Sequence, residues 1–132
     1  MIKKIPRAFQ VLIMEASAME VFFWIVDLQI PFMMIVIGLI FRKWAPKKIN
    51  SVTGYRTKRS MASQEAWEYA NRRFAELWLK IGCLLLALII LIKLLFPFNS
   101  AKLSLIINLC VVAIMLLSTL IVERELKEKF NY

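Results

Sequence analysis

The polar segment between residues 50 and 71 holds the side chains with the clearest chemical potential. Arg56 always carries its charge and presents five N–H donors, so it can hold a lipid phosphate, a peptide carboxylate or the carbonyl end of a helix. Other polar residues could complete a cup around such a group: Asn50, Thr57, Ser60 and Asn71. The same residues also have a structural use. Gly54 can form a turn, Asn50 and Thr57 can satisfy the loop backbone, and Arg56 can tie the loop to the rest of the protein.

Catalytic chemistry has little support in the residue types. The chain contains no histidine, which removes the commonest general base and the commonest transition-metal ligand. It has no Cys-x-x-Cys pair and no cluster of carboxylates. Cys83 and Cys110 each lie in an apolar run, where a free cysteine behaves as a small hydrophobic residue. We therefore expect no enzyme activity, no metal site and no cofactor.

Three apolar runs must position these polar residues. The chain has 132 residues, of which 61% are hydrophobic, against about 45–50% in a soluble domain. The excess is concentrated in residues 21–41, 77–96 and 103–122, and each run is long enough to cross a hydrocarbon core of roughly 30 Å as a helix. This pattern excludes an ordinary soluble enzyme, a disordered tail and a secreted disulfide scaffold. It predicts an all-α, polytopic membrane domain, 21–132, with three transmembrane helices.

The basic residues predict the orientation of these spans. The formal net charge is +9, and basic residues gather in the loop 42–76: Arg42, Lys43, Lys47, Lys48, Arg56, Lys58, Arg59, Arg72 and Arg73. Only Lys93 and Lys102 flank the short turn at 97–102. Loops rich in lysine and arginine stay in the cytoplasm, so we expect the N-terminus outside and the C-terminus inside a cytoplasmic membrane. This explanation of the charge is simpler than binding to nucleic acid, which we do not expect.

The second half of the long loop has the pattern of an amphipathic helix that leads into the second span. Ser63 is a suitable N-cap, and Glu65 complements the helix dipole in the first turn. One face collects Trp67, Ala70, Asn71, Phe74 and Trp78. The two tryptophans are interpreted as ordinary interfacial aromatics. Nearby, Lys58, Arg59, Arg72 and Arg73 form a basic surface that would attract anionic lipid headgroups, at about 1 kcal/mol each.

Charged residues inside the spans need separate explanations. Lys80 and Lys93 lie near the ends of the second span and can extend to the interfaces. Asp27 is the acidic residue within a span, and an intramembrane carboxylate is a candidate functional group. It could pair with Lys80 or Lys93, or contact a cationic peptide. If the first span begins near Trp24, Asp27 simply lies at the interface, and this is the interpretation we favour.

The two ends of the chain are less informative. Residues 1–20 could form an interfacial helix, extend the first span, or derive from an upstream start codon, with Met14 and Met19 as alternative starts. Residues 123–132 carry opposite charges four positions apart, at Glu123/Lys127, Arg124/Glu128 and Glu125/Lys129. Such pairs each support a helix by a few tenths of a kcal/mol. We interpret this segment as a solvated helix end.

The polar segment resembles the SdpI family of bacterial membrane proteins. The family pattern combines an asparagine, a run of Gly, an aromatic or aliphatic residue, Arg and Thr, then a serine or threonine, and a tryptophan followed by an asparagine or histidine on a helix. This sequence provides Asn50, Gly54, Tyr55, Arg56, Thr57, Ser60, Trp67 and Asn71 in that order. The resemblance covers roughly residues 24–122. It is a resemblance to the C-terminal three-span module of the family, so the chain is interpreted as a short form.

The resemblance implies two functions, since the family is named for an immunity protein against a secreted toxin peptide. The first is immunity by non-catalytic binding of a peptide toxin at the eight residues of the pattern. The second is signalling, in which the basic loop holds a soluble repressor at the membrane. A small transporter or lipid-acting enzyme is a third hypothesis, which three spans without a nucleophile motif support poorly. Membrane lipids are expected partners in every case.

Overall fold

Three long helices make up the structure, a computed structural model that describes residues 5–96 and 101–131. They are α1 (Arg7–Trp44), α2 (Gln64–Leu95) and α3 (Ala101–Phe130), and this described part contains no strand. Each helix is long and apolar enough to cross a membrane. The prediction of a three-span, all-α membrane protein is confirmed. The turn predicted at 97–102 lies largely outside the described residues.

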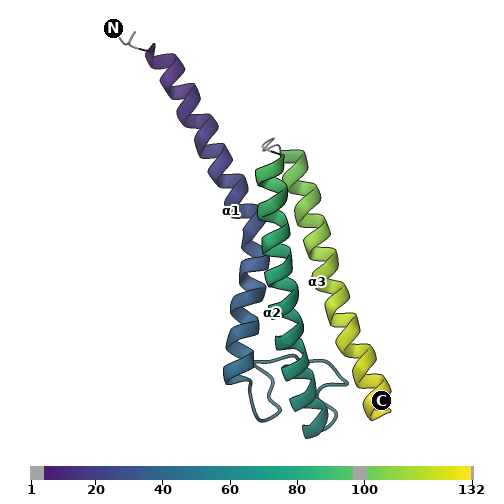
Figure 1. Cartoon of the computed structure of the whole chain (residues 1–132). Helices are drawn as coiled ribbons and strands as arrows, with labels where there is room; N and C mark the ends of the chain where they lie inside the picture. Colours follow the sequence, from purple (N-terminus) through teal and green to yellow (C-terminus); the bar gives the residue numbers. More distant parts are fainter. Residues whose placement is uncertain (1–4, 97–100, 132) are drawn as a thin grey trace.

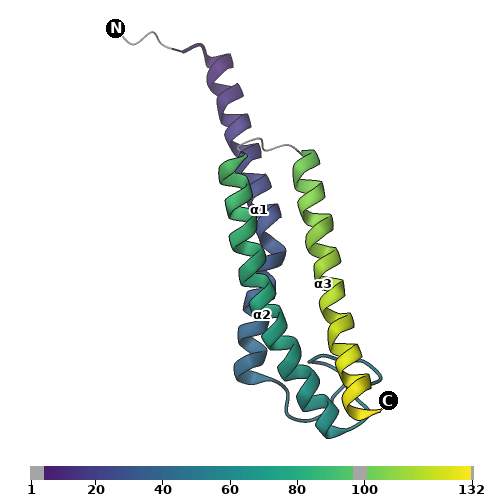
Figure 2. The same ribbon diagram turned by 45° about the vertical axis from the view of Figure 1, so that its right-hand side comes forward.

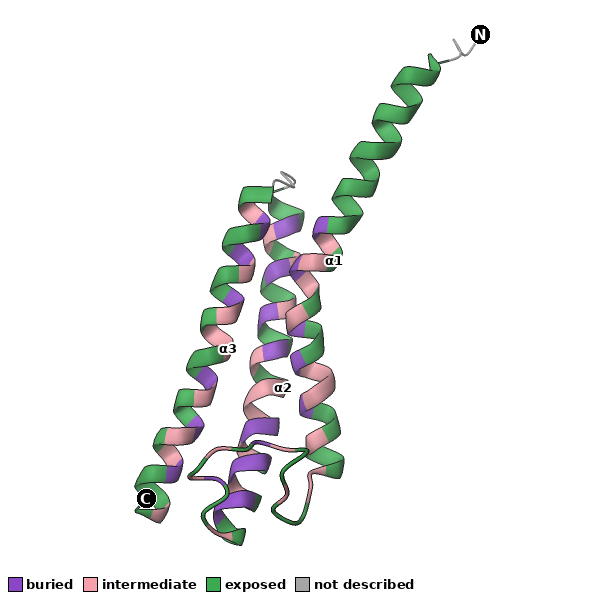
Figure 3. Cartoon of the chain, turned by 180° about the vertical axis from the view of Figure 1, so that it is seen from behind, coloured by how far each residue is buried: buried purple, intermediate pink, exposed green. Residues whose placement is uncertain are grey.

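Helix α1 is much longer than the first predicted span. It runs without interruption from Arg7 to Trp44, so residues 7–20 extend the first helix. Figures 1 and 2 show that this N-terminal part projects beyond the ends of α2 and α3, and Figure 3 shows it exposed. The helix continues through Pro31. Proline has no N–H to donate to the carbonyl four residues earlier, so the carbonyl of Asp27 lacks its helical partner.

Helix α2 joins the predicted amphipathic helix and the second span in one element. Its N-cap is Ser63, whose hydroxyl accepts from the Ala66 N–H at 3.1 Å, as predicted. The predicted inner face is buried over its first turns, at Trp67, Ala70, Asn71 and Phe74. We call one end of the bundle the loop end: it holds the first turns of α2 and the 45–63 loop.

Two glycines allow α1 and α2 to approach closely. A Cβ at Gly38 would meet the backbone nitrogen of Leu79 at 2.8 Å, and one at Gly82 would meet the Pro31 carbonyl oxygen at 3.0 Å. Gly38 and Gly82 are far apart in sequence and form no local small-residue motif, but each lies where one helix meets the other. Small residues at such crossings are a common means of packing helices in membranes.

The apolar core lies in two clusters along the bundle. The cluster at the loop end contains Tyr55, Phe74, Val122 and Leu126, and the other contains Met34, Leu85, Ile89 and Val111. Cys83 and Cys110 are exposed on the helix surfaces, so neither is part of this core. Much of the remaining apolar surface is exposed, as expected for helices that face lipid.

Candidate functional site

The first part of the pattern forms a tight turn at the loop end. The side-chain oxygen of Asn50 accepts from the N–H groups of Val52 at 2.9 Å and Thr53 at 2.8 Å. Gly54 follows with a φ of 109°, a conformation that residues with a Cβ rarely adopt. A Cβ there would also meet the Asn71 Oδ1 at 2.8 Å. Asn50 and Gly54 therefore shape the backbone, which is the structural use identified above.

Asn71 connects this turn to α2. It is 1% exposed, its Oδ1 accepts from the Tyr55 N–H at 2.8 Å, and its Nδ2 donates to the Trp67 carbonyl at 2.9 Å. Trp67 is fully buried and its indole N–H donates to the Pro46 carbonyl at 2.7 Å. The interpretation of Trp67 as an interfacial aromatic is wrong, because its ring fills the space beneath the loop. Trp78 instead bridges two helices, through a 3.1 Å hydrogen bond to the Ser118 hydroxyl.

Thr57 and Ser60 close a second turn by reciprocal hydrogen bonds. The Thr57 N–H donates to the Ser60 hydroxyl oxygen at 2.8 Å, and the Ser60 N–H donates to the Thr57 hydroxyl oxygen at 3.1 Å. The Ser60 hydroxyl in turn donates to the Tyr55 carbonyl at 2.8 Å. Ser60 is completely buried. Ser60 is satisfied by Thr57 and the backbone, and the Thr57 side chain also bonds Glu123 of α3, so neither residue presents a free donor to a ligand.

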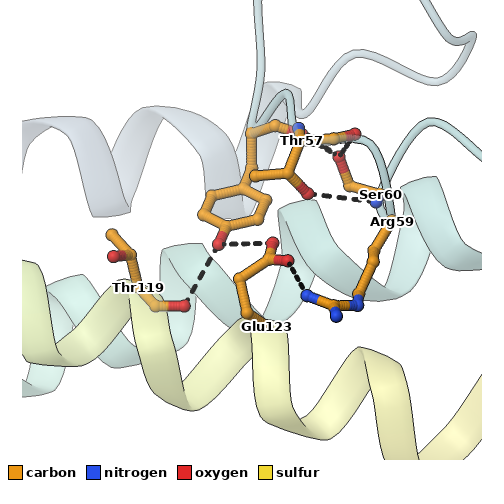
Figure 4. A network of polar contacts seen from close by, with 6 residues as sticks. Thr57, Arg59, Ser60, Thr119 and Glu123 are labelled. Carbon is orange, nitrogen blue, oxygen red and sulfur yellow. Dashed lines mark hydrogen bonds and ion pairs between the residues drawn. The ribbon is translucent and has the colours of Figure 1, made fainter. Parts of the chain in front are cut away.

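The carboxylate of Glu123, from α3, links this turn to the bundle. It accepts from the Tyr55 hydroxyl at 3.0 Å and pairs with the Arg59 guanidinium at 3.1 Å. Figure 4 shows Glu123 of α3 extending toward Arg59, with Thr57 and Ser60 on the loop above it. The predicted role for Arg56 as the tie between loop and spans is therefore wrong. Arg56 is exposed and its guanidinium donates to the Ser51 carbonyl within the loop, while Arg59 makes the tie.

A second carboxylate, two residues farther along α3, repeats the arrangement. Glu125 accepts from the Tyr69 hydroxyl at 2.9 Å and binds Arg73 of α2 through both carboxylate oxygens, with its closest contact at 2.8 Å. In both cases a tyrosine and an arginine four residues later hold one glutamate of α3. The interpretation of residues 123–132 as merely a solvated helix end is thus wrong. Of the three expected pairs within the helix, Arg124–Glu128 is present, at 2.9 Å.

These contacts shift the pKa values of both glutamates. Burial alone would raise the pKa of Glu123, but hydrogen bonds from Thr57, Arg59 and Tyr55 outweigh it and lower that pKa. The hydrogen bonds from Arg73 are the main reason that the pKa of Glu125 is lowered. Burial and then the hydrogen bond to Glu123 raise the pKa of the Tyr55 hydroxyl. Both carboxylates are therefore stabilised in their charged form by folding.

Acidification should loosen α3 at the loop end. A carboxyl group with a lowered pKa in the folded state stabilises the fold fully above its unfolded pKa, about 4.3 for glutamate, and this contribution disappears as the pH falls through the folded value. We expect the free energy of unfolding in detergent micelles to fall between about pH 5 and pH 3. The variant Glu125→Gln should be less stable at pH 7 and should show a smaller fall. An unchanged pH dependence in this variant would contradict the role of Glu125.

The predicted basic surface divides into two kinds of residue. Arg59 and Arg73 are held by the two glutamates, whereas Lys58 and Arg72 are exposed and form no ion pair within residues 5–96 and 101–131. Lys58 and Arg72 thus remain available to an anionic partner. Arg59 and Arg73 instead position α3.

A second polar cluster lies at the opposite end of the bundle, around Asp27. Its carboxylate pairs with the Lys93 ammonium of α2 at 2.6 Å, and the two side chains are 0% and 1% exposed. It also accepts from the Asn108 amide at 2.9 Å and from the Ser104 hydroxyl, both on α3. Lys93 lies 5.0 Å from the centre of the Trp24 ring. Of the partners considered for Asp27, the structure shows Lys93, and the two charges neutralise one another inside the bundle.

A small groove borders this cluster between α1 and α3. It has a volume of about 250 Å³ and is lined by Phe23, Val26, Ala101, Ser104, Leu105 and Asn108. Ser104 and Asn108 thus reach both Asp27 and the groove. Sequence reasoning missed them, although two polar residues four positions apart in an otherwise apolar span were a usable signal.

Together, the three apolar helices and their polar ties define a polytopic α-helical membrane protein. Residues 47–122 match the SdpI/YfhL protein family. Over 84 residues the chain is also 40% identical to the Uncharacterized protein YfhL of Bacillus subtilis (strain 168), which covers 64% of this chain and 74% of that protein. The chain belongs to the SdpI/YfhL family, as its resemblance suggested. No solved structure gives a significant match.

Proposed function

We propose that this protein gives immunity to a secreted antimicrobial peptide by binding it in the membrane, without catalysis. Family membership suggests immunity, since the family is named for a protein of that kind. The observation that supports binding is the cluster of Asp27, Lys93, Ser104 and Asn108, which joins all three helices. Polar residues are costly in a membrane and are usually retained there for function.

The position of this cluster suits a ligand that arrives from outside the cell. The basic loop favours a cytoplasmic location for the loop end, and in that orientation the Asp27 cluster would lie in the outer half of the membrane. The adjacent groove is largely apolar, with Ser104 and Asn108 as its polar wall. An amphipathic peptide could insert apolar side chains beside Phe23 and Leu105 and hydrogen-bond to Asn108.

The test is survival of a sensitive host challenged with an SDP-type peptide toxin. The chain and its variants are expressed at matched membrane levels. We expect the intact chain to protect, and the double variant Asp27→Leu/Lys93→Met to lose protection, because it removes the charged pair without leaving one charge unpaired. Glu15→Gln, on the projecting part of α1, is the matched control and should protect normally.

Two outcomes would contradict the proposal in different ways. No protection by the intact chain would reject immunity to this toxin class. Full protection by the double variant would reject the Asp27 cluster as the binding site. Parallel tests of Arg56→Ala would then show whether the exposed loop arginine contributes to protection.

A second candidate function is signalling through a soluble repressor, supported by the exposed basic pair Lys58 and Arg72. An acidic surface on a repressor could bind there from the cytoplasm. The charge reversal Lys58→Glu/Arg72→Glu should abolish co-purification of the repressor and leave the fold intact, because neither residue is in an ion pair within the described chain. Arg59 and Arg73 are unsuitable for this test, since reversing them would disrupt α3. A repressor that still co-purifies would reject this function.

A further inference from the structure

A polar hollow opens where the chain leaves α1 and passes beside α2. It has a volume of about 360 Å³ and is lined by Ala45, Pro46, Lys47, Glu68, Asn71 and Arg72. One wall is fixed, because the Pro46 carbonyl accepts the hydrogen bond from the buried Trp67 indole at 2.7 Å. The hollow is therefore a formed feature of the loop end.

The two cations that line this hollow have no acidic partner in the described chain, and Asn71 has one N–H left over. Lys47 and Arg72 are exposed, and no carboxylate lies within ion-pair distance of either in residues 5–96 and 101–131. The Asn71 amide nitrogen carries two N–H groups, but within the described chain it donates only to the Trp67 carbonyl. Asn71 is 1% exposed, and a buried N–H without an acceptor costs free energy. An oxyanion in the hollow would satisfy all three donors.

The lining also indicates the charge of that anion. Lys47 and Arg72 carry two positive charges, and Glu68 carries one negative charge, which leaves a net charge of +1. The Glu68 carboxylate is already held by the Gln64 amide at 2.9 Å. This balance fits a singly charged phosphodiester better than a doubly charged phosphate.

The surroundings place the hollow at a membrane surface. It follows directly after Trp44, which is 67% exposed and has the Lys43 ammonium 4.7 Å from its ring centre. Exposed tryptophan and lysine at the end of an apolar helix mark the headgroup region of a bilayer. A second hollow, of about 520 Å³, runs along Leu39, Ile40 and Trp44 and could receive an acyl chain.

We propose that this hollow binds the phosphodiester headgroup of an anionic phospholipid. Lys47, Arg72 and the free N–H of Asn71 hold the phosphate oxygens, and the lipid tail follows α1. The bound lipid would fix the loop end against the membrane surface. The proposal does not depend on immunity, because it concerns the other end of the bundle.

Native mass spectrometry of the purified full chain tests this proposal, by titration with phosphatidylglycerol and with phosphatidylcholine. We expect the intact chain to retain phosphatidylglycerol preferentially. Lys47→Gln/Arg72→Gln should weaken this binding roughly tenfold or more, since each basic residue near an anionic surface contributes on the order of 1 kcal/mol. Glu68→Gln should strengthen it. The matched control Lys48→Gln/Lys127→Gln removes two exposed charges outside the lining and should have little effect.

Three results would overturn the proposal. Equal weakening in the control pair would mean diffuse attraction of the basic surface. Equal retention of both lipids by the intact chain would exclude recognition of the anionic headgroup. Displacement of phosphatidylglycerol by inorganic phosphate at equal concentration would show a site for the free anion, without a contribution from the lipid tail.

Discussion

Replacing Asp27 by alanine should destabilise the protein more than any other single change at a polar residue. The Lys93 ammonium would then stay 1% exposed without its counter-ion, and removing one partner of a buried ion pair costs about 3–5 kcal/mol. Ser104 and Asn108 would also lose the acceptor that connects α3 to α1. The measurement is the free energy of unfolding in mixed micelles, followed by tryptophan fluorescence as the fraction of denaturing detergent rises.

The double variant Asp27→Leu/Lys93→Met provides the control for this prediction. Replacing a whole buried ion pair by apolar residues is often neutral or stabilising, so the double variant should be more stable than Asp27→Ala, although Ser104 and Asn108 lose the same acceptor in both variants. If Asp27→Ala were as stable as the intact chain, Lys93 would have found another partner or left the bundle. Once the unfolding measurement shows that the double variant is folded, its protection against the toxin reports on binding.

Enlarging Gly82 or Gly38 should separate α1 from α2. A Cβ at Gly82 already meets the Ile35 Cγ1 at 2.9 Å and the Pro31 carbonyl oxygen at 3.0 Å, and valine would add two more carbons. Overpacking of this kind usually costs about 1–3 kcal/mol. Backbone atoms form part of the contact, so side-chain rotation alone cannot relieve it. We therefore expect Gly82→Val and Gly38→Val each to lower the free energy of unfolding by at least this amount.

The matched control is Ala87→Val, on the exposed surface of α2. It adds two carbons, against three for glycine to valine, but on an exposed surface, so the unfolding midpoint should barely move. A Gly82→Val variant as stable as Ala87→Val would contradict the close approach of the two helices at this point.

Periodicity and capping were sufficient to predict the helices. Ser63 begins α2 because its hydroxyl can accept a first-turn N–H, and the apolar face of Trp67, Ala70 and Phe74 is buried as its spacing indicates. The length of α1 was underestimated, because Glu15 and Glu20 interrupt the apolar run although they do not interrupt the helix. Hydropathy reports where a helix can meet lipid, whereas hydrogen bonding decides where it ends.

The polar contacts between helices were harder to predict. Glu123 and Glu125 have opposite charges four residues away, so local pairs seemed sufficient, yet arginines 64 and 52 positions earlier hold them instead. Asp27 had two candidate lysines, and the sequence could not distinguish them. Lys93 is the partner because residues 27 and 93 lie at the same depth on neighbouring helices, a relation that only the tertiary packing defines.

The order in which these contacts can form during synthesis follows from their separation along the chain. Asp27 and the 50–60 loop are translated early, but their α3 partners, Ser104, Asn108, Glu123 and Glu125, come 52 to 81 residues after the groups they bind. The first two helices must therefore enter the membrane with several polar groups unsatisfied. Arrival of α3 then completes the polar contacts at both ends of the bundle, so these contacts depend on the last of the three helices to enter the membrane.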